Sequence, residues 1–230
     1  MKNKKWKKYA FEFLSIFIAV ISAFALNNWN DTRNNKHSEQ KILTEIKNSI
    51  KIDIQDFDIN IYGNKMSLKA DSIFRELING KKVSQDSIGI YYTALFRDYI
   101  PIINKSAYES LKANNLKTIS TDSLRLQIIS LYDYYYSIME KLEYEVPEMK
   151  SYKNYFQRIN TILYPFMEFN ENGELISIND LNQLDTNQKK EILSYLWRIR
   201  NNRKFKLRKY DLIIKVIEKV ENNIGKELKQ

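Results

Sequence analysis

The sequence predicts an all-α protein in which an N-terminal transmembrane helix continues into a stalk and then an antiparallel helical bundle. Three observations predict this fold class. Residues 13–30 carry no charge and follow a start rich in lysine. Only five Gly and three Pro occur in 230 residues, which disfavours the many tight turns of sandwiches and barrels. After residue 31, apolar residues recur every three or four positions, which is typical of amphipathic helices.

The N-terminal region has the pattern of a membrane anchor. A helix needs about 20 residues to cross a bilayer, and residues 10–30 supply them. Trp6 and Trp29 are placed to lie at the two membrane interfaces. Lysines are concentrated in residues 1–9, so the positive-inside bias predicts a cytoplasmic tail and an extracytoplasmic domain over residues 31–230.

Two other interpretations of the same segment remain open. Lysines, an apolar run and Ala23-Phe24-Ala25 also fit a cleavable signal peptide. A buried core helix is the third possibility, but an uncharged stretch rarely follows five lysines in a soluble domain. Glu12 is either a functional group inside the span or an interfacial residue that pairs with Lys8 four positions earlier.

The anchor also resembles that of a known family. Glu12 is followed by fourteen mostly apolar residues and then by Asn27, Asn28, Trp29 and Asn30, with Asp31 next. This spacing is similar to a bacterial domain-of-unknown-function family of single-pass membrane proteins, and residues 106–136 resemble the second recurring block of that family. Asn114-Asn115 stands where Ser-Gly is common, and still permits a left-handed helix end. The resemblance implies a retained anchor and carries over no functional residue. Together with the lysine bias, it leads us to expect the anchor in the bacterial inner membrane and the domain in the periplasm.

The first part of the domain, residues 31–79, is predicted to be a stalk helix region. Its apolar face includes Leu43, Ile46, Ile50 and Phe57. Ile50, Ile52 and Ile54 also alternate as a strand would, but helical patterns on both sides favour a helix. We expect Gly63 to kink or interrupt this helix.

Bundle helices are predicted over residues 84–164 and 186–229. Within them, Ser106 and Glu109 have the spacing of a capping box. Residues 122–146 contain a heptad seam, and Pro147 fits the first position of the next helix. The seam is formed by Leu124, Ile128, Leu131, Tyr135, Ile138 and Leu142.

The end of the chain is predicted to contain a turn and two helices. Asn170 to Gly173 has turn composition. The helices are expected at residues 186–201 and 204–228, with a corner between them. No internal repeat or second domain boundary occurs.

The composition excludes much of enzyme chemistry. There is no cysteine and one histidine, His37, so Cys/His zinc sites and thiol nucleophiles are excluded. Asp53, Asp56, Asp58 and Asn60 superficially resemble a calcium loop but lack its Gly and closing Glu. We therefore expect no catalytic residue, cofactor or metal site.

A basic run between residues 198 and 209 is a candidate binding patch. Seven of its twelve residues are basic and none is acidic: Arg198, Arg200, Arg203, Lys204, Lys206, Arg208 and Lys209. With Trp197 and Phe205 interleaved, the run is suited to binding phosphates. Outside the cytoplasm nucleic acid is not an expected ligand, so anionic lipid, an acidic partner or a glycan is favoured. The alternative is a solvated corner between two helices.

Four tyrosines between residues 132 and 136 admit two interpretations. Tyr132, Tyr134, Tyr135 and Tyr136 cover several faces of one helix. Tyrosine is favoured at interfaces because it combines a large apolar area with a hydrogen-bonding hydroxyl. The alternative is core packing with the hydroxyls at the rim.

Together these patterns predict a membrane-anchored, non-enzymatic scaffold, sensor or accessory subunit. We expect it to act through helix packing with itself or with an envelope protein, and Glu12 and Asn27 to Asn30 are its candidate helix contacts in the membrane. Binding of anionic lipid or polyanion through the basic run is one alternative. A membrane-tethered hydrolase that uses carboxylates alone is another.

Overall fold

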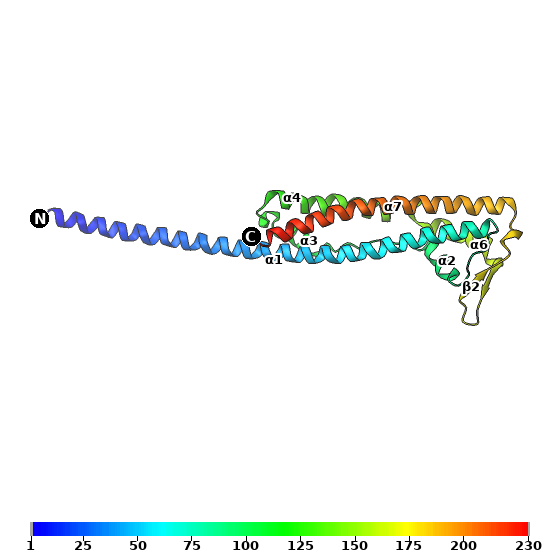
Figure 1. Ribbon diagram of the computed structural model, residues 1–230. Coiled ribbons are helices and arrows are strands. Elements are labelled where there is room, and N and C mark those ends of the chain that lie inside the picture. Colours follow the sequence, from blue (N-terminus) through cyan, green and yellow to red (C-terminus); the bar gives the residue numbers. More distant parts are fainter. Residues whose placement is uncertain (1, 230) are drawn as a thin grey trace.

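The molecule is a rod built around one very long helix (Figure 1). The computed structural model describes the backbone of residues 2–229 and the side chains of residues 8–229. Helix α1, Lys2–Ile78, has 77 residues, and α7, Thr186–Glu227, has 42. The C-terminus ends beside the middle of α1, so α7 runs antiparallel along the second half of α1 (Figure 1). This architecture confirms the predicted all-α class.

Shorter elements connect the two long helices. The helical ones are α2 (Ile88–Phe96), α3 (Ser106–Asn114), η1 (Leu116–Thr118), α4 (Asp122–Ser130), η2 (Leu131–Tyr136), α5 (Ser137–Glu140), η3 (Lys141–Glu145), η4 (Pro147–Met149), η5 (Tyr152–Phe156), α6 (Gln157–Leu163), η6 (Tyr164–Phe166) and η7 (Leu181–Gln183). Strands β1 (Met167–Phe169) and β2 (Leu175–Ile178) form an antiparallel hairpin in which Met167 pairs with Ile178. The predicted turn at 170–173 connects these strands. The hairpin and α2 project from the far end of the rod (Figure 1).

The first part of α1 is a bare helix. Residues 8–38 are exposed throughout, and the apolar segment within them is long and apolar enough to cross a membrane. Packing begins near Glu39, whose carboxylate accepts a hydrogen bond from the backbone N–H of Ser120 at 2.7 Å. Leu43 is the first fully buried apolar residue of the inward face. Most of the predicted stalk, residues 31–79, is therefore packed inside the bundle.

Two apolar cores lie in sequence along the rod. The proximal core joins α1 to α3, α4 and the last part of α7, with Ile46, Ile50 and Phe57 at 0% exposure. The distal core joins the end of α1 to α2, α6, β2 and the start of α7, and contains Phe74 and Leu196. Each core buries one stripe of α1 and one stripe of α7, which explains why both helices remain regular along the length over which they are packed.

Two predicted breaks and one predicted cap do not form. Helix α1 is continuous through Gly63, and α7 is continuous through residues 201–204, because both helices are packed on a partner there. The Ser106 capping box does not form, since Lys105 occupies the N-cap without a side-chain hydrogen bond. Asn115 is extended, with φ of −174°, and its side chain instead accepts from Lys117 N.

The predicted heptad seam is correct only in its first half. Leu124, Ile128 and Leu131 are buried as expected. The π-helical turn of η2 then adds a residue to the helical turn and rotates the following face by one position. The inward residues become Tyr132, Tyr136, Met139 and Glu143 in place of Tyr135, Ile138 and Leu142. Two of the four tyrosines thus belong to the core, while Tyr134 is exposed.

Candidate functional site

A buried polar layer separates the two apolar cores. The inward face of α1 is apolar at Phe57 and again at Ala70 and Phe74, but most of the buried positions between Phe57 and Phe74 are polar. Asn60, Asn64, Ser67 and Asp71 occupy the inward positions there at helical spacing, and all are buried. Because buried polar groups need partners, this layer must be completed by other elements.

Arg203 of α7 is the central residue of this layer. Its side chain is fully buried and donates to Ser67 Oγ at 3.1 Å and to the backbone oxygen of Arg97 at 2.7 Å. The guanidinium also lies over the ring of Tyr99, 5.6 Å from its centroid. Burial lowers the pKa of Arg203, and the nearby Asp98 carboxylate partly opposes that effect. Arg203 therefore ties α1, α7 and the segment after α2 together.

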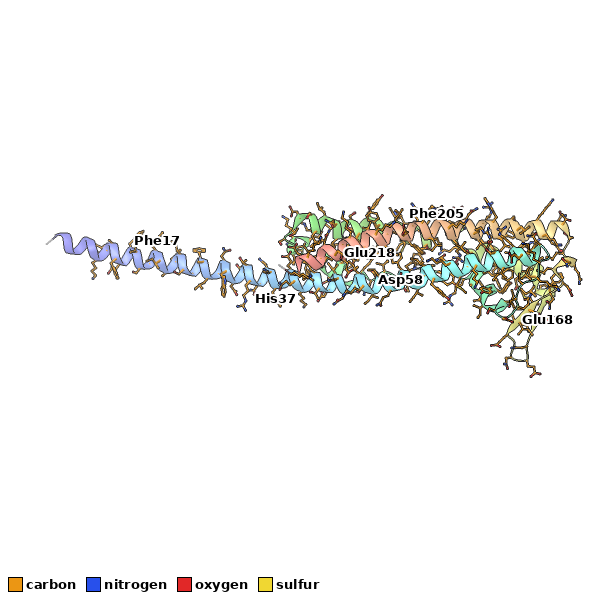
Figure 2. The ribbon with its side chains drawn as sticks, in the orientation of Figure 1. Phe17, His37, Asp58, Glu168, Phe205 and Glu218 are labelled. Carbon is orange, nitrogen blue, oxygen red and sulfur yellow. The ribbon has the colours of Figure 1, made fainter. Side chains whose placement is uncertain are left out.

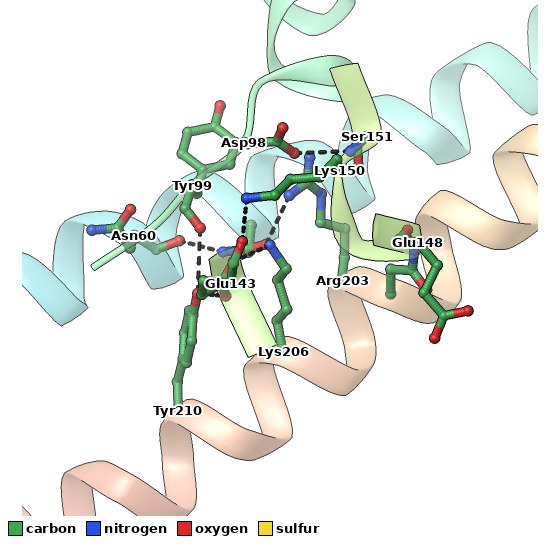
Figure 3. Close-up of polar contacts among 12 residues, drawn as sticks. Asn60, Asp98, Tyr99, Glu143, Glu148, Lys150, Ser151, Arg203, Lys206 and Tyr210 are labelled. Atoms are coloured by element: carbon green, nitrogen blue, oxygen red, sulfur yellow. Dashed lines mark hydrogen bonds and ion pairs between the residues drawn. The ribbon is translucent and has the colours of Figure 1, made fainter. Parts of the chain in front are cut away.

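Glu143 of η3 supplies the negative charge beside Arg203 (Figure 3). Its carboxylate accepts from the ammonium of Lys206 and from the hydroxyl of Tyr210, both on α7. Lys150 donates to the backbone oxygen of Glu143. Burial lowers the pKa of Lys206, and the Glu143 carboxylate opposes that effect. The carboxylate has no exposed surface, so this cluster is a closed polar centre of the fold.

Two further carboxylates of α1 hold the segment that follows α2. Asp53 accepts from the backbone N–H of Asn104 at 2.8 Å and from the hydroxyl of Tyr136 at 2.9 Å. Asp56 accepts from the backbone N–H of Ile102 at 2.7 Å. Burial raises the pKa of Asp53 to about 6. These residues, which resemble a calcium loop in sequence, bind the backbone of residues 102–104 instead.

An open groove lies directly over the polar layer. It has a volume of about 1270 Å³ and is bounded by α1, α2, residues 98–100 and the edge of β2. Its floor depends on Gly63, because a Cβ at that position would lie 2.1 Å from the ring of Tyr99. At the opposite wall, Gly89 allows α2 to approach the backbone of Leu175 closely. We call this feature the distal groove.

The distal groove combines exposed apolar side chains with acidic ones. Its large exposed apolar residues are Ile59 and Tyr62 at 67% exposure, Ile90 at 63% and Ile176 at 47%. Its acidic residues are Asp56, Asp86, Asp98 and Glu174, and its basic residue is Arg97. Among the described side chains none of these four carboxylates forms an ion pair. The groove therefore combines an apolar floor with more acidic than basic side chains.

The candidate anchor residues all lie on the bare part of α1. Glu12 is 3.9 Å from the ammonium of Lys8, the pairing expected for an interfacial residue. Asn27 donates to Asp31 at 3.1 Å, and the ring of Trp29 lies 5.8 Å from the guanidinium carbon of Arg33. Their remaining surfaces face outward. The side chain of Trp6 lies outside the described residues.

The basic run does not form one surface. Arg203 and Lys206 are buried, so these two residues are not available to a ligand on the surface. Arg200 is half-buried and pairs with Asp71. Of the remaining four, Arg198, Lys204 and Arg208 are exposed, and Lys209 is half-buried. The expected corner between two helices is absent, because α7 is continuous there.

The groove residues carried no recognisable sequence pattern. Ile59, Tyr62 and Ile90 belong to helices that also have a regular inward face. Single apolar residues on the outer face of such a helix are common, so the sequence does not distinguish these three from ordinary surface residues. The polar layer, in contrast, had a signal. Asn60, Asn64 and Ser67 continue the spacing of the buried face, where polar residues indicate buried hydrogen bonds.

His37 is exposed on the bare part of α1. In the described residues no group of three or more His, Cys, Asp or Glu side chains is arranged to hold a metal ion.

Comparison with known proteins identifies a family and no described activity. Residues 12–163 match the profile of a family described as a family of unknown function (DUF6090). This match begins at Glu12 and extends through α6. No curated protein and no solved structure matches the chain.

Proposed function

We propose that this chain, which belongs to the DUF6090 family of unknown function, is a membrane-anchored, non-enzymatic scaffold or accessory subunit that binds a protein partner through the distal groove. The observation that carries the proposal is the groove itself. It exposes four large apolar side chains beside four carboxylates that form no ion pair among the described residues. Clustered exposed apolar side chains of this kind are typical of protein-binding surfaces.

The dimensions of the groove also favour a protein partner. At about 1270 Å³ it exceeds the usual range of small-molecule pockets, about 300 to 1000 Å³, and it is open along one side. Amphipathic helices bind to other proteins in apolar grooves of this type. A groove with an acidic rim selects a partner segment that carries basic residues beside its apolar ones.

The long helix α1 would set the position of the groove relative to the membrane. If residues 10–30 cross the bilayer, the stretch from Asn30 to Asn64 places the groove about 50 Å beyond it, at about 1.5 Å per residue. The lysines of residues 1–9 favour a cytoplasmic N-terminus and a periplasmic domain in the bacterial inner membrane. Because α1 packs into both cores, it would hold the groove at a fixed distance from the membrane, which suits a scaffold.

The lipid-binding alternative is less well supported. Two of the seven basic residues are buried, and Arg203 contacts Ser67 of α1, so the run lies about 50 Å from the proposed membrane surface. Headgroups of the same membrane are out of reach of an upright rod. The hydrolase alternative gains no support from the buried polar layer. Glu143 is closed off and already bound to Lys206 and Tyr210.

The partner proposal is tested by photo-crosslinking in native membranes. A photoreactive amino acid replaces Tyr62 in the groove, and the matched control replaces Leu126, an exposed apolar residue of α4 outside the groove. We expect a discrete covalent adduct with a protein from the groove position and at least five-fold less from the control. The absence of an adduct at Tyr62 in membranes that contain the folded protein would contradict the proposal.

The topology is tested separately. A short tag at each end of the full chain, probed with protease in intact cells and in permeabilised cells, reports which end is protected. We expect the C-terminal tag to be cleaved once the outer barrier is opened and the N-terminal tag to remain protected. A protected C-terminus would contradict the proposed orientation without bearing on the groove.

A further inference from the structure

We infer that the occupant of the distal groove is a second copy of this chain, whose α7 helix supplies a basic surface to it. This inference rests on the proposed function, since it requires an open groove that binds protein. It names the partner and predicts how copies are arranged. The binding surface on α7 is the part of the basic run that the fold leaves exposed.

The exposed face of α7 has the chemistry that the groove requires. Residues Trp197, Arg198, Asn201, Lys204, Arg208 and Leu212 are exposed and recur at helical spacing along one side of the helix. We call them the basic stripe. Arg198, Lys204 and Arg208 form no ion pair within the described part of the chain. Trp197 and Leu212 are 58% and 55% exposed, and give the stripe an apolar residue at each end.

Charge and apolar surface are complementary between the stripe and the groove. The groove has four carboxylates and one basic residue, whereas the stripe has three basic residues and no acid. Both surfaces contain large exposed apolar side chains beside these charges. Opposite charges that form no ion pair within their own chain favour association between chains and fix its register.

The two surfaces also lie at the same level along the rod. Arg203 of α7 donates to Ser67 of α1 at 3.1 Å, and the rings of Phe57 and Tyr210 are 5.4 Å apart. The stripe of α7 is therefore level with the α1 residues that line the groove. Copies anchored side by side in one membrane with one orientation would hold the stripe of each at the height of the groove of its neighbour.

The two surfaces lie on opposite sides of the molecule. Phe205, within the stripe segment of α7, and Glu168, on the hairpin beside the groove, are on opposite sides of the rod (Figure 2). A contact between opposite sides joins successive copies in the same direction. Such a heterologous contact generates a row or a closed ring. The proposed assembly is thus a row or ring of parallel rods in the plane of the membrane.

The test uses the absence of cysteine from the chain. Two differently tagged full-length chains are co-expressed, one with Tyr62→Cys in the groove and the other with Asn201→Cys in the stripe. Membranes are treated with a short bismaleimide, and crosslinked pairs are identified by their tags. We expect a mixed pair, and at least five-fold less product when Asn201→Cys is replaced by Glu218→Cys, an exposed α7 position outside the stripe (Figure 2).

Charge reversal makes the test specific. Lys204→Glu with Arg208→Glu in the stripe chain should reduce the mixed product at least five-fold, and Asp86→Lys with Glu174→Lys in the groove chain should restore it. Equal crosslinking between two Tyr62→Cys chains would overturn the inference in favour of a two-fold contact. If the mixed pair is absent while a photoreactive residue at position 62 captures a different protein, the inference fails and the proposed function stands. If position 62 captures no protein, both fail.

Discussion

Glu143, Lys206 and Arg203 show how individual charged residues determine the packing of the long helices. A buried ion pair contributes little net stability over an apolar pair of the same shape, but leaving one member unpaired is costly. Here Glu143 of η3 pairs with Lys206 of α7, and Arg203 of α7 donates to Ser67, one of the polar positions of α1. We infer that the hydrogen bonds and ion pair of the buried polar layer fix the register of α7 against α1.

The first prediction concerns Lys206. Lys206→Met leaves the Glu143 carboxylate buried without its ammonium partner, and should lower the free energy of unfolding by about 3–5 kcal/mol. Unfolding by urea, followed by circular dichroism of the full chain in detergent, measures the change. The matched control is Lys204→Met, an exposed lysine of the same helix, which should change stability by less than about 0.5 kcal/mol. Equal losses of unfolding free energy from the two substitutions would contradict a buried ion pair between Lys206 and Glu143.

The second prediction concerns the ionisation of Asp53. Burial raises its pKa from 3.8 to about 6, so the folded protein binds more protons than the unfolded chain between these values. Stability should therefore fall as pH rises from about 4 to 6, by about 1–3 kcal/mol from this group. Asp53→Asn should flatten that part of the pH profile of the unfolding free energy. The exposed neighbour substitution Asp58→Asn should leave the profile unchanged, and an unaltered slope in Asp53→Asn would refute the assignment.

Sequence patterns predicted the roles of residues correctly only where all residues on one face of a helix have the same chemical character. The apolar inward residues Ile46, Ile50 and Phe57 follow from their spacing. Arg203 and Lys206 were predicted in the same basic patch as Lys204 and Arg208, because spacing in sequence does not say which side of the helix meets Glu143. The partner that decides their burial is distant in the chain, and no local pattern contains it.

At the level of elements, glycine positions decide where the chain segments approach each other. Gly63 was expected to kink or interrupt α1, yet α1 is uninterrupted there and the residue makes room for the Tyr99 ring. Gly225 of α7 faces only the end of the flexible Lys47 side chain. The same substitution should thus have opposite effects at the two positions.

The third prediction compares those two glycines. Gly63→Ala forces the Tyr99 ring and residues 98–100 to move, and should destabilise the protein by about 1–3 kcal/mol. Gly225→Ala should be neutral or stabilise by up to about 1 kcal/mol, because alanine is the better helix former and Lys47 can move. Thermal unfolding of both variants measures the difference. A destabilisation at Gly63 that Tyr99→Ala fails to reduce would argue against the contact.

The fourth prediction separates two candidate helix caps. Asp185 accepts hydrogen bonds from the backbone N–H groups of Asn187 and Gln188, so Asp185→Ala should cost about 1 kcal/mol. Ser106→Ala should have an effect below about 0.5 kcal/mol, since no cap forms there. Urea unfolding of each variant gives both values. A larger loss at Ser106 than at Asp185 would be inconsistent with the observed caps.

Element type was easier to predict from sequence than element boundaries. The long apolar N-terminal helix, the all-α class and the turn at 170–173 followed from composition and local pattern. The break expected between residues 201 and 204 did not occur, because packing of α7 against α1 outweighs the local density of charge. The seam of residues 122–146 failed after Leu131, where the π-turn in η2 rotates the face by one residue. Such turns have no simple sequence signature.

For the whole molecule, the decisive property is that one helix runs from the apolar segment to the distal core. Helix α1 leaves only residues 31–38 between the apolar segment and the packed bundle. The height of the distal groove is therefore set by a short, bare helical stretch. Residues can be inserted in this stretch without changing either core. An insertion there would change the distance between the groove and the membrane.

The fifth prediction uses such an insertion to test the parallel arrangement of copies. Duplicating residues 31–37 adds seven residues, raises the rod by about 10 Å and rotates it only about 20°. Two lengthened chains, or two normal ones, should crosslink between Tyr62→Cys and Asn201→Cys to the same extent. A lengthened chain paired with a normal one should crosslink at least five-fold less, because its stripe is no longer level with the groove of its neighbour. Equal crosslinking in mixed and matched pairs would show that a common height does not determine which surfaces meet.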